Sequence, residues 1–93
     1  MIRVYKKLKV PNVFSPNGDG INDTWVITGI DTYPEATVKV FSRSGLVVFQ
    51  TKSNEKAWDG TYNGKPVPVG TYYYLINLYT GQPLISGWIL IIR

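Results

Sequence analysis

The residues best suited to chemistry lie in the stretch FSPNGDGINDTW, which runs from Phe14 to Trp25. Its carboxylate and amide oxygens resemble the ligand pattern of calcium loops, D-x-[DN]-x-[DN]-G, in which oxygen ligands alternate and glycine is sixth. With Gly20 as the sixth position, the third, fifth and ninth positions are Asn17, Asp19 and Asp23. These three residues are therefore candidate metal ligands, and the metal would be calcium.

Two other residues weaken this calcium hypothesis. The first position is Ser15 instead of aspartate, and the twelfth is Val26 instead of a bidentate glutamate. Calcium affinity depends on the number of charged ligands, so we expect weak binding if the loop binds the ion at all. In the alternative interpretation, Asn-Gly and Asp-Gly shape a compact loop whose carboxylates accept hydrogen bonds from backbone N–H groups.

Composition excludes most catalytic chemistry. The chain has neither cysteine nor histidine, so a Ser–His–Asp or Cys–His arrangement cannot form. Asp19, Asp23 and Asp59 remain as carboxylates, but a small β-rich chain rarely builds the cleft that paired carboxylates need. We therefore expect no enzyme and no required cofactor.

The charge and apolar patterns of the sequence limit which classes of partner are expected. The net charge is +4, and four basic residues fall within the first nine positions, where lysines typically protect an edge strand. No basic run accompanies a nucleic-acid motif, so we expect no nucleic acid partner. The apolar run WILII is far shorter than a membrane helix, and residues 1–20 lack the apolar core of a signal peptide. We expect no membrane insertion and a monomeric isolated domain.

The elements that position the loop are strands. ATVKVF and GLVVFQ flank the turn SRSG and predict a β-hairpin over residues 36–50. TYYYLINLY alternates, with Tyr72, Tyr74, Ile76 and Leu78 on one face. LISGWILIIR has apolar residues at both odd and even positions. This pattern predicts a central strand that is well covered on both faces. Asp59-Gly60 and Asn63-Gly64 predict turns, and the prolines at 66 and 68 predict an edge strand or loop.

Such spacing, without crossover helices, predicts an all-β fold: an Ig-like antiparallel β-sandwich of about seven strands. Residues 1–9 would be a linker tail or first strand, and residues 10–93 the domain. The aromatic residues Trp25, Trp58 and Trp88 are expected to pack in or around the core. Alternatively, Trp58, Tyr62, Tyr73 and Tyr79 could form an exposed platform that stacks on sugars or a partner.

Four motifs in order resemble the gliding motility-associated C-terminal domain, the type B sorting domain of the type IX secretion system in Bacteroidetes. They are VFSPNGDGINDTW, VFSRSGLVVFQT, WDGTYNGKPVPVGTYYYLINL and SGWILIIR. The likeness covers about residues 10–93, nearly the whole chain. The chain departs from the family pattern at Ser42-Arg43-Ser44-Gly45, where Asn-Arg-Trp-Gly is usual, and at Trp25, where phenylalanine is common.

This resemblance implies an Ig-like, non-catalytic C-terminal sorting domain of a large secreted or surface protein, such as an adhesin. Its parent would be exported through the periplasm to the cell surface or extracellular medium. The implied partners are the type IX translocon and a dedicated outer-membrane partner protein. The candidate recognition loop is Asn17, Gly18, Asp19, Gly20, Asn22 and Asp23, and the candidate C-terminal signal is Arg93. The alternative function is an Ig-like adhesion module that binds glycan or protein, with calcium as a candidate stabilising ion.

Overall fold

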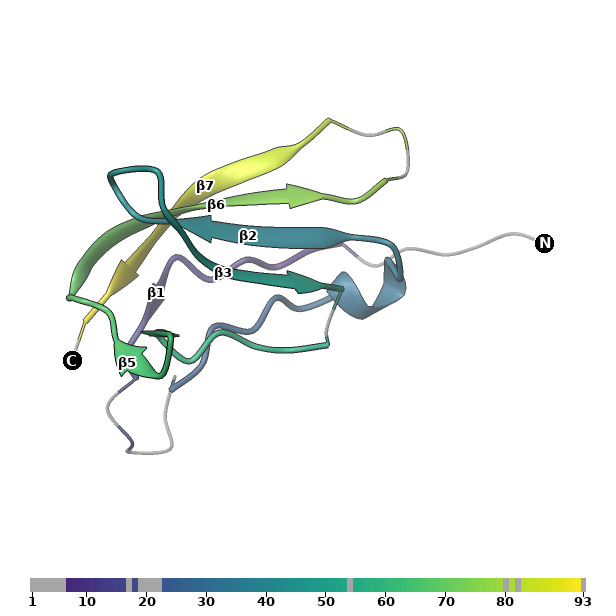
Figure 1. Cartoon of the computed structure of the whole chain (residues 1–93). Coiled ribbons are helices and arrows are strands. Elements are labelled where there is room, and N and C mark those ends of the chain that lie inside the picture. Colours follow the sequence, from purple (N-terminus) through teal and green to yellow (C-terminus); the bar gives the residue numbers. More distant parts are fainter. Residues whose placement is uncertain are drawn as a thin grey trace.

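The structure is a computed structural model that describes residues 7–16, 18, 23–53, 55–79, 81 and 83–92. These residues form one five-stranded sheet and one two-stranded sheet (Figure 1). The larger sheet has the order β1-β7-β6-β2-β3. Its strands are β1 (Val13–Phe14), β7 (Ile85–Ile91), β6 (Gly70–Asn77), β2 (Thr37–Phe41) and β3 (Val47–Lys52). The smaller sheet pairs β4 (Thr61–Tyr62) with β5 (Lys65–Pro66), and a 3-10 helix, η1, covers Ile30–Thr32.

A second layer of extended chain packs against the five-stranded sheet. Single antiparallel bridges join Lys9 to Thr28 and Trp25 to Trp58, so segments 8–10, 24–28 and 57–59 lie side by side. Figure 1 shows the segment before η1 and the segment after β3 running below the large sheet in that view. The predicted all-β sandwich with seven strands is confirmed.

One pair of strands departs from the antiparallel prediction. β1 and β7 run parallel, with Val13 opposite Leu90 and Phe14 opposite Ile91. The other pairs of the large sheet, β7–β6, β6–β2 and β2–β3, are antiparallel as expected. Parallel strands need a long crossover, and here almost the whole chain separates β1 from β7. The first strand of the domain is therefore paired directly with its last strand.

The predicted hairpin over residues 36–50 is confirmed as β2 and β3. Val38 and Val40 are buried and Lys39 is exposed, as the alternation in ATVKVF requires. The turn between the strands closes through Ser42, whose backbone N–H donates to the Leu46 carbonyl at 2.8 Å. Gly45 supplies a positive φ of 92° in this turn, a conformation that glycine adopts without strain.

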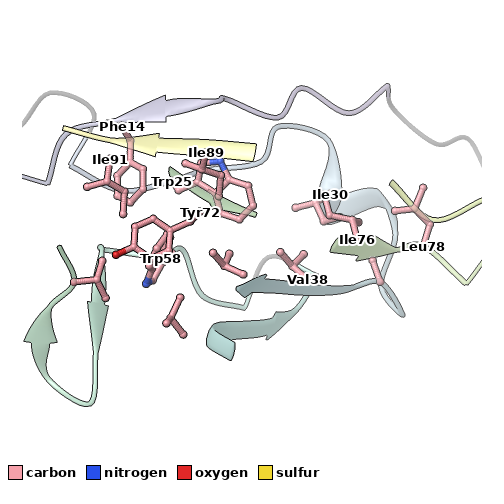
Figure 2. Packing of buried hydrophobic residues seen from close by; sticks show 14 of the residues in the cluster. Phe14, Trp25, Ile30, Val38, Trp58, Tyr72, Ile76, Leu78, Ile89 and Ile91 are labelled. Atoms are coloured by element: carbon pink, nitrogen blue, oxygen red, sulfur yellow. The ribbon is translucent and has the colours of Figure 1, made fainter. Parts of the chain in front are cut away.

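The core lies between the two layers and is rich in aromatic rings (Figure 2). Trp58 is 1% exposed, and its ring lies 5.5 Å from Phe14 and 5.6 Å from Tyr72 between centroids. Ile89 and Ile91 cover these rings from β7 and are fully buried. The prediction that Trp25 and Trp58 pack in the core is confirmed.

Tyr72 forms a tyrosine corner at the start of β6. Its hydroxyl donates to the Pro68 carbonyl, four residues upstream, at 2.7 Å. In immunoglobulin domains, the corresponding tyrosine precedes the second disulfide cysteine by two residues. That place is taken by Tyr74, whose ring lies 5.5 Å from Trp25 on the opposite layer. An aromatic pair therefore joins the layers of this cysteine-free sandwich where antibody domains use a disulfide.

Candidate recognition surface

The predicted loop is described at two of its six candidate residues. The Gly18 N–H donates to Oδ1 of Asp23 at 2.9 Å, and Gly18 has a φ of 80°. The Asp23 carboxylate therefore closes the loop by bonding backbone, as the structural interpretation predicted. Asn17, Asp19, Gly20 and Asn22 lie outside the described residues, as does Arg93.

The N-terminal side of the loop packs against Gly60. This glycine belongs to the turn formed by Trp58, Asp59 and Gly60, which we call the WDG turn. A Cβ atom at Gly60 would lie 2.8 Å from Cγ of Pro16 and 3.7 Å from the Phe14 ring. Gly60 is buried and has a φ of 80°. A side chain at residue 60 would therefore push the chain away at the start of the loop.

The WDG turn is fixed by side-chain hydrogen bonds. Oδ1 of Asp59 accepts bonds from the Thr61 N–H at 3.1 Å and the Thr61 hydroxyl at 2.6 Å. The indole Nε1–H of Trp58 donates to the Thr61 carbonyl at 3.0 Å. This Asx-type arrangement explains why aspartate and glycine occur together there. The turn predicted at Asp59-Gly60 is confirmed.

The turn continues into the β4–β5 hairpin. Asn63 and Gly64 have φ values of 54° and 79°, which is the pattern of a type I′ turn. The predicted Asn-Gly turn is therefore confirmed, and Pro66 lies in a short edge strand, as expected. The Val67 N–H then donates to the Gly60 carbonyl at 2.9 Å, which fastens the base of the hairpin to the WDG turn.

The second side of the loop is held by Trp25. Its backbone N–H donates to the Trp58 carbonyl at 2.8 Å, and its indole Nε1–H donates to the Pro11 carbonyl at 2.7 Å. Trp25 is also almost fully buried. Both ends of the loop are therefore anchored in the core, through Phe14 on one side and Trp25 on the other.

The end of the last strand lies beside the start of this loop. The Ile92 N–H donates to the Phe14 carbonyl at 3.1 Å, and the Leu90 N–H donates to the Asn12 carbonyl at 2.7 Å. Ile92, the last described residue, is thus bonded to Phe14, which lies just before the loop. The described residues just before the loop and the described end of the last strand therefore meet at one end of the sandwich. We call this end, with the WDG turn and the β4–β5 hairpin, the loop end.

The four aromatic residues considered as an alternative exposed platform do not form one. Trp58 is in the core, while the exposed residues Tyr62, Tyr73 and Tyr79 belong to β4, β6 and the segment after β6. Trp88 was expected to pack in or around the core but is 48% exposed. It lies opposite Tyr73, which is 46% exposed, on the outward face of the large sheet. The prediction that β7 is well covered on both faces is therefore wrong for its outward face.

Within the described part of the chain, no three His, Cys, Asp or Glu side chains gather as a metal site. The calcium hypothesis stays a prediction, because Asn17 and Asp19 are outside that part. No helix among the described residues is long and apolar enough to cross a membrane.

Comparison with known proteins gives one match. A family model described as "CHU_C Type IX secretion signal domain" matches residues 8–91, which include every described strand. No curated protein and no solved structure matches the chain significantly. Type IX secretion signal domains mark proteins for export to the cell surface or extracellular medium and interact with the type IX machinery. The resemblance found in the sequence is confirmed: the chain belongs to the CHU_C family of type IX secretion signal domains.

Proposed function

We propose that this domain is a non-catalytic sorting signal that directs a large secreted or surface protein through the type IX secretion system. In this proposal, the translocon and an outer-membrane partner protein recognise the domain in its folded state. The family match over residues 8–91 carries the proposal. The absence of histidine and cysteine is consistent with a binding role.

We further propose that recognition uses the loop end. Recognition commonly depends on loops that a rigid scaffold holds in place. Buried aromatic residues flank this loop on both sides, and the bond from Ile92 to Phe14 brings the last described residue to the same region. The residues proposed to be read are Asn17, Gly18, Asp19, Gly20, Asn22, Asp23 and Arg93.

A reporter fusion tests whether the domain acts as a sorting signal. The whole chain is joined to the C-terminus of a reporter that carries an ordinary signal peptide. The fusion is expressed in a Bacteroidetes host that has the type IX system and a matching partner protein. We expect the reporter on the cell surface or in the medium. If it stays in the periplasm, an adhesion module that binds glycan or protein directly becomes the better interpretation.

The same fusion tests the loop. Asp19→Ala and Asp23→Ala are each compared with Asp31→Ala, which removes an exposed carboxylate from η1 instead. We expect the two loop variants to reduce export while the Asp31 variant does not. Thermal melting of each purified domain separates recognition from unfolding. Unchanged export of both folded loop variants would remove the loop from the recognition surface.

A further inference from the structure

The outward face of the large sheet carries an apolar patch. Tyr73 and Trp88 are cross-strand partners, and Phe41 lies opposite Tyr73 on the next strand. The neighbouring row places Val13 opposite Leu90, and Ile92 follows at the same parity. We call Val13, Phe41, Tyr73, Trp88, Leu90 and Ile92 the aromatic face.

The folded domain does not cover this face with its own described residues. Val13, Tyr73, Trp88 and Ile92 are each at least 40% exposed. The solvent face of an antiparallel sheet is ordinarily polar, with the apolar positions turned to the core. A contiguous exposed apolar patch commonly marks a contact with another molecule, and tyrosine and tryptophan are enriched in such contacts. The face therefore has a composition that folding alone does not explain.

Charge on the same side is basic. The strand register places these polar and basic residues on the outward face beside the apolar patch: Thr37, Lys39, Gln50, Lys52, Thr71, Asn77 and Ser86. No aspartate or glutamate occupies an outward position of the five described strands. Lys52 pairs with Glu35 at 3.2 Å at the far edge, whereas Lys39 has no carboxylate of the described residues within salt-bridge distance.

A groove beside the aromatic face adds an arginine. It has a volume of about 350 Å³ and lies between the β2–β3 turn and the chain before β6. Arg43 lines it from the turn, and Val69 and Thr71 line it from the other side. Thr71 is the cross-strand partner of Leu90, so the groove opens next to the aromatic face. An arginine fork there matches a carboxylate in shape and charge.

We propose that the aromatic face and the Arg43 groove together bind an acidic partner protein of the secretion machinery. That partner would present an apolar patch to Tyr73 and Trp88 and a carboxylate to Arg43. A second copy of this chain fits less well, because two facing copies would bring Lys39 and Arg43 of both into one basic interface. This inference rests on the proposed function, but it adds a second surface, which adjoins the loop end at Ile92.

The reporter fusion tests the apolar part of this surface. Tyr73→Ser combined with Trp88→Ser removes the exposed rings without touching the core. The matched control is Val26→Ser combined with Tyr79→Ser, which removes exposed apolar side chains outside both the aromatic face and the loop end. We expect the face variant to lose about tenfold or more of its export, as when hot-spot contacts are lost, and the control to lose much less. Thermal melting confirms that both variants are folded.

A second pair of variants tests the charge. Arg43→Glu and Lys56→Glu change the net charge equally, and both residues are exposed, but only Arg43 lines the groove. We expect Arg43→Glu to reduce export several-fold, Arg43→Lys to retain most of it, and Lys56→Glu to have little effect. Equal export of the Arg43 and Lys56 charge reversals would overturn the acidic-partner assignment.

The outcomes separate this inference from the proposed function. A wild-type fusion that is not exported contradicts the proposed function itself. A wild-type fusion that is exported, together with a Tyr73/Trp88 variant exported as well as its control, overturns only the aromatic-face proposal. Sedimentation of the purified domain adds a further check: a dimer that Tyr73→Ser dissociates would assign the face to a second copy. A glycan that quenches Trp88 fluorescence and competes with export would assign it to a carbohydrate.

Discussion

The rings of Trp25 and Tyr74 lie 5.5 Å apart at an interplanar angle of 47° and join the two layers of the sandwich. Tyr74 follows the tyrosine corner by two residues, at the position of an immunoglobulin disulfide cysteine. The pair lets a cysteine-free domain connect its layers by ring packing and by the Trp25 indole bond to Pro11. It also holds Trp25 in place two residues after Asp23, the last residue of the candidate recognition loop.

Gly87 leaves the space that the Tyr74 ring fills. A Cβ atom at residue 87 would lie 2.5 Å from the Tyr74 hydroxyl oxygen and 2.7 Å from Cζ. We expect Gly87→Ala to lower the free energy of unfolding by about 1–3 kcal/mol, the usual effect of overpacking. Urea denaturation measures the change, with the exposed neighbour Ser86→Ala as the control. Equal stability of the two variants would show that the ring moves aside without strain.

The tyrosine corner predicts a difference between adjacent tyrosines. Tyr72→Phe removes the hydroxyl that donates to Pro68, so we expect the free energy of unfolding to fall by about 1 kcal/mol. Tyr73→Phe changes the same atom on an exposed side chain and should have almost no effect. Thermal or urea unfolding of both variants measures the difference. A Tyr72 variant as stable as the Tyr73 variant would mean that the corner does not stabilise the fold.

The contact between Pro16 and Gly60 predicts how the loop depends on the WDG turn. Gly60→Ala and Gly64→Ala both place alanine at a positive φ near 80°, but only residue 60 faces Pro16. We expect Gly60→Ala to be more destabilising by about 1–2 kcal/mol, because its Cβ overlaps Pro16. Adding Pro16→Ala should recover part of that excess. Identical denaturation midpoints for the two glycine variants would contradict the contact.

The Asp23 carboxylate predicts a difference between two substitutions. Asparagine keeps an oxygen that can accept the Gly18 N–H, whereas alanine does not. We expect Asp23→Asn to keep the Gly18 amide resonance in place and Asp23→Ala to shift it and lower stability by about 1 kcal/mol. Repeating the measurements with millimolar calcium tests the cation hypothesis. A calcium-dependent rise in melting temperature that Asp23→Asn abolishes would favour an ion site in the loop.

Burial predicts the alkaline behaviour of Tyr74. Desolvation raises the pKa of its hydroxyl, because the phenolate form is disfavoured when buried. The stability linked to this group is complete below the ordinary tyrosine pKa of about 10. It is lost as the pH rises from there through the raised pKa of the folded state. We expect Tyr74→Phe to flatten the fall in stability at alkaline pH, measured by urea denaturation against pH. The same slope in both proteins would contradict this account.

Local patterns predicted much of the fold. The alternation in ATVKVF and TYYYLINLY identified the buried faces of β2 and β6, and the Asn63-Gly64 dipeptide identified a hairpin turn. These signals are local, because the period of a strand and the φ of a glycine depend on neighbouring residues. The parallel pairing of β1 with β7 has no local signal, since β1 is two residues long and its partner is at the other end of the chain.

The outward face shows the limit of periodicity. Apolar residues at both parities of β7 predicted a strand covered on both faces, yet Trp88 is exposed. The sequence pattern does not distinguish an apolar side chain exposed on a binding surface from one buried in the core. Likewise, Pro16 and Gly60 are far apart in the sequence, and only the fold brings them into contact. The loop residues were recognisable as a motif, but their anchoring by Trp25 and Phe14 was not.

The most direct test of the central claim is the exported fraction of the reporter fusion in two strains. One strain has a working type IX system and the other lacks it. If the domain is an address, the first strain exports the reporter and the second retains it in the periplasm. An equal exported fraction in both strains would show that the domain does not direct export through this system.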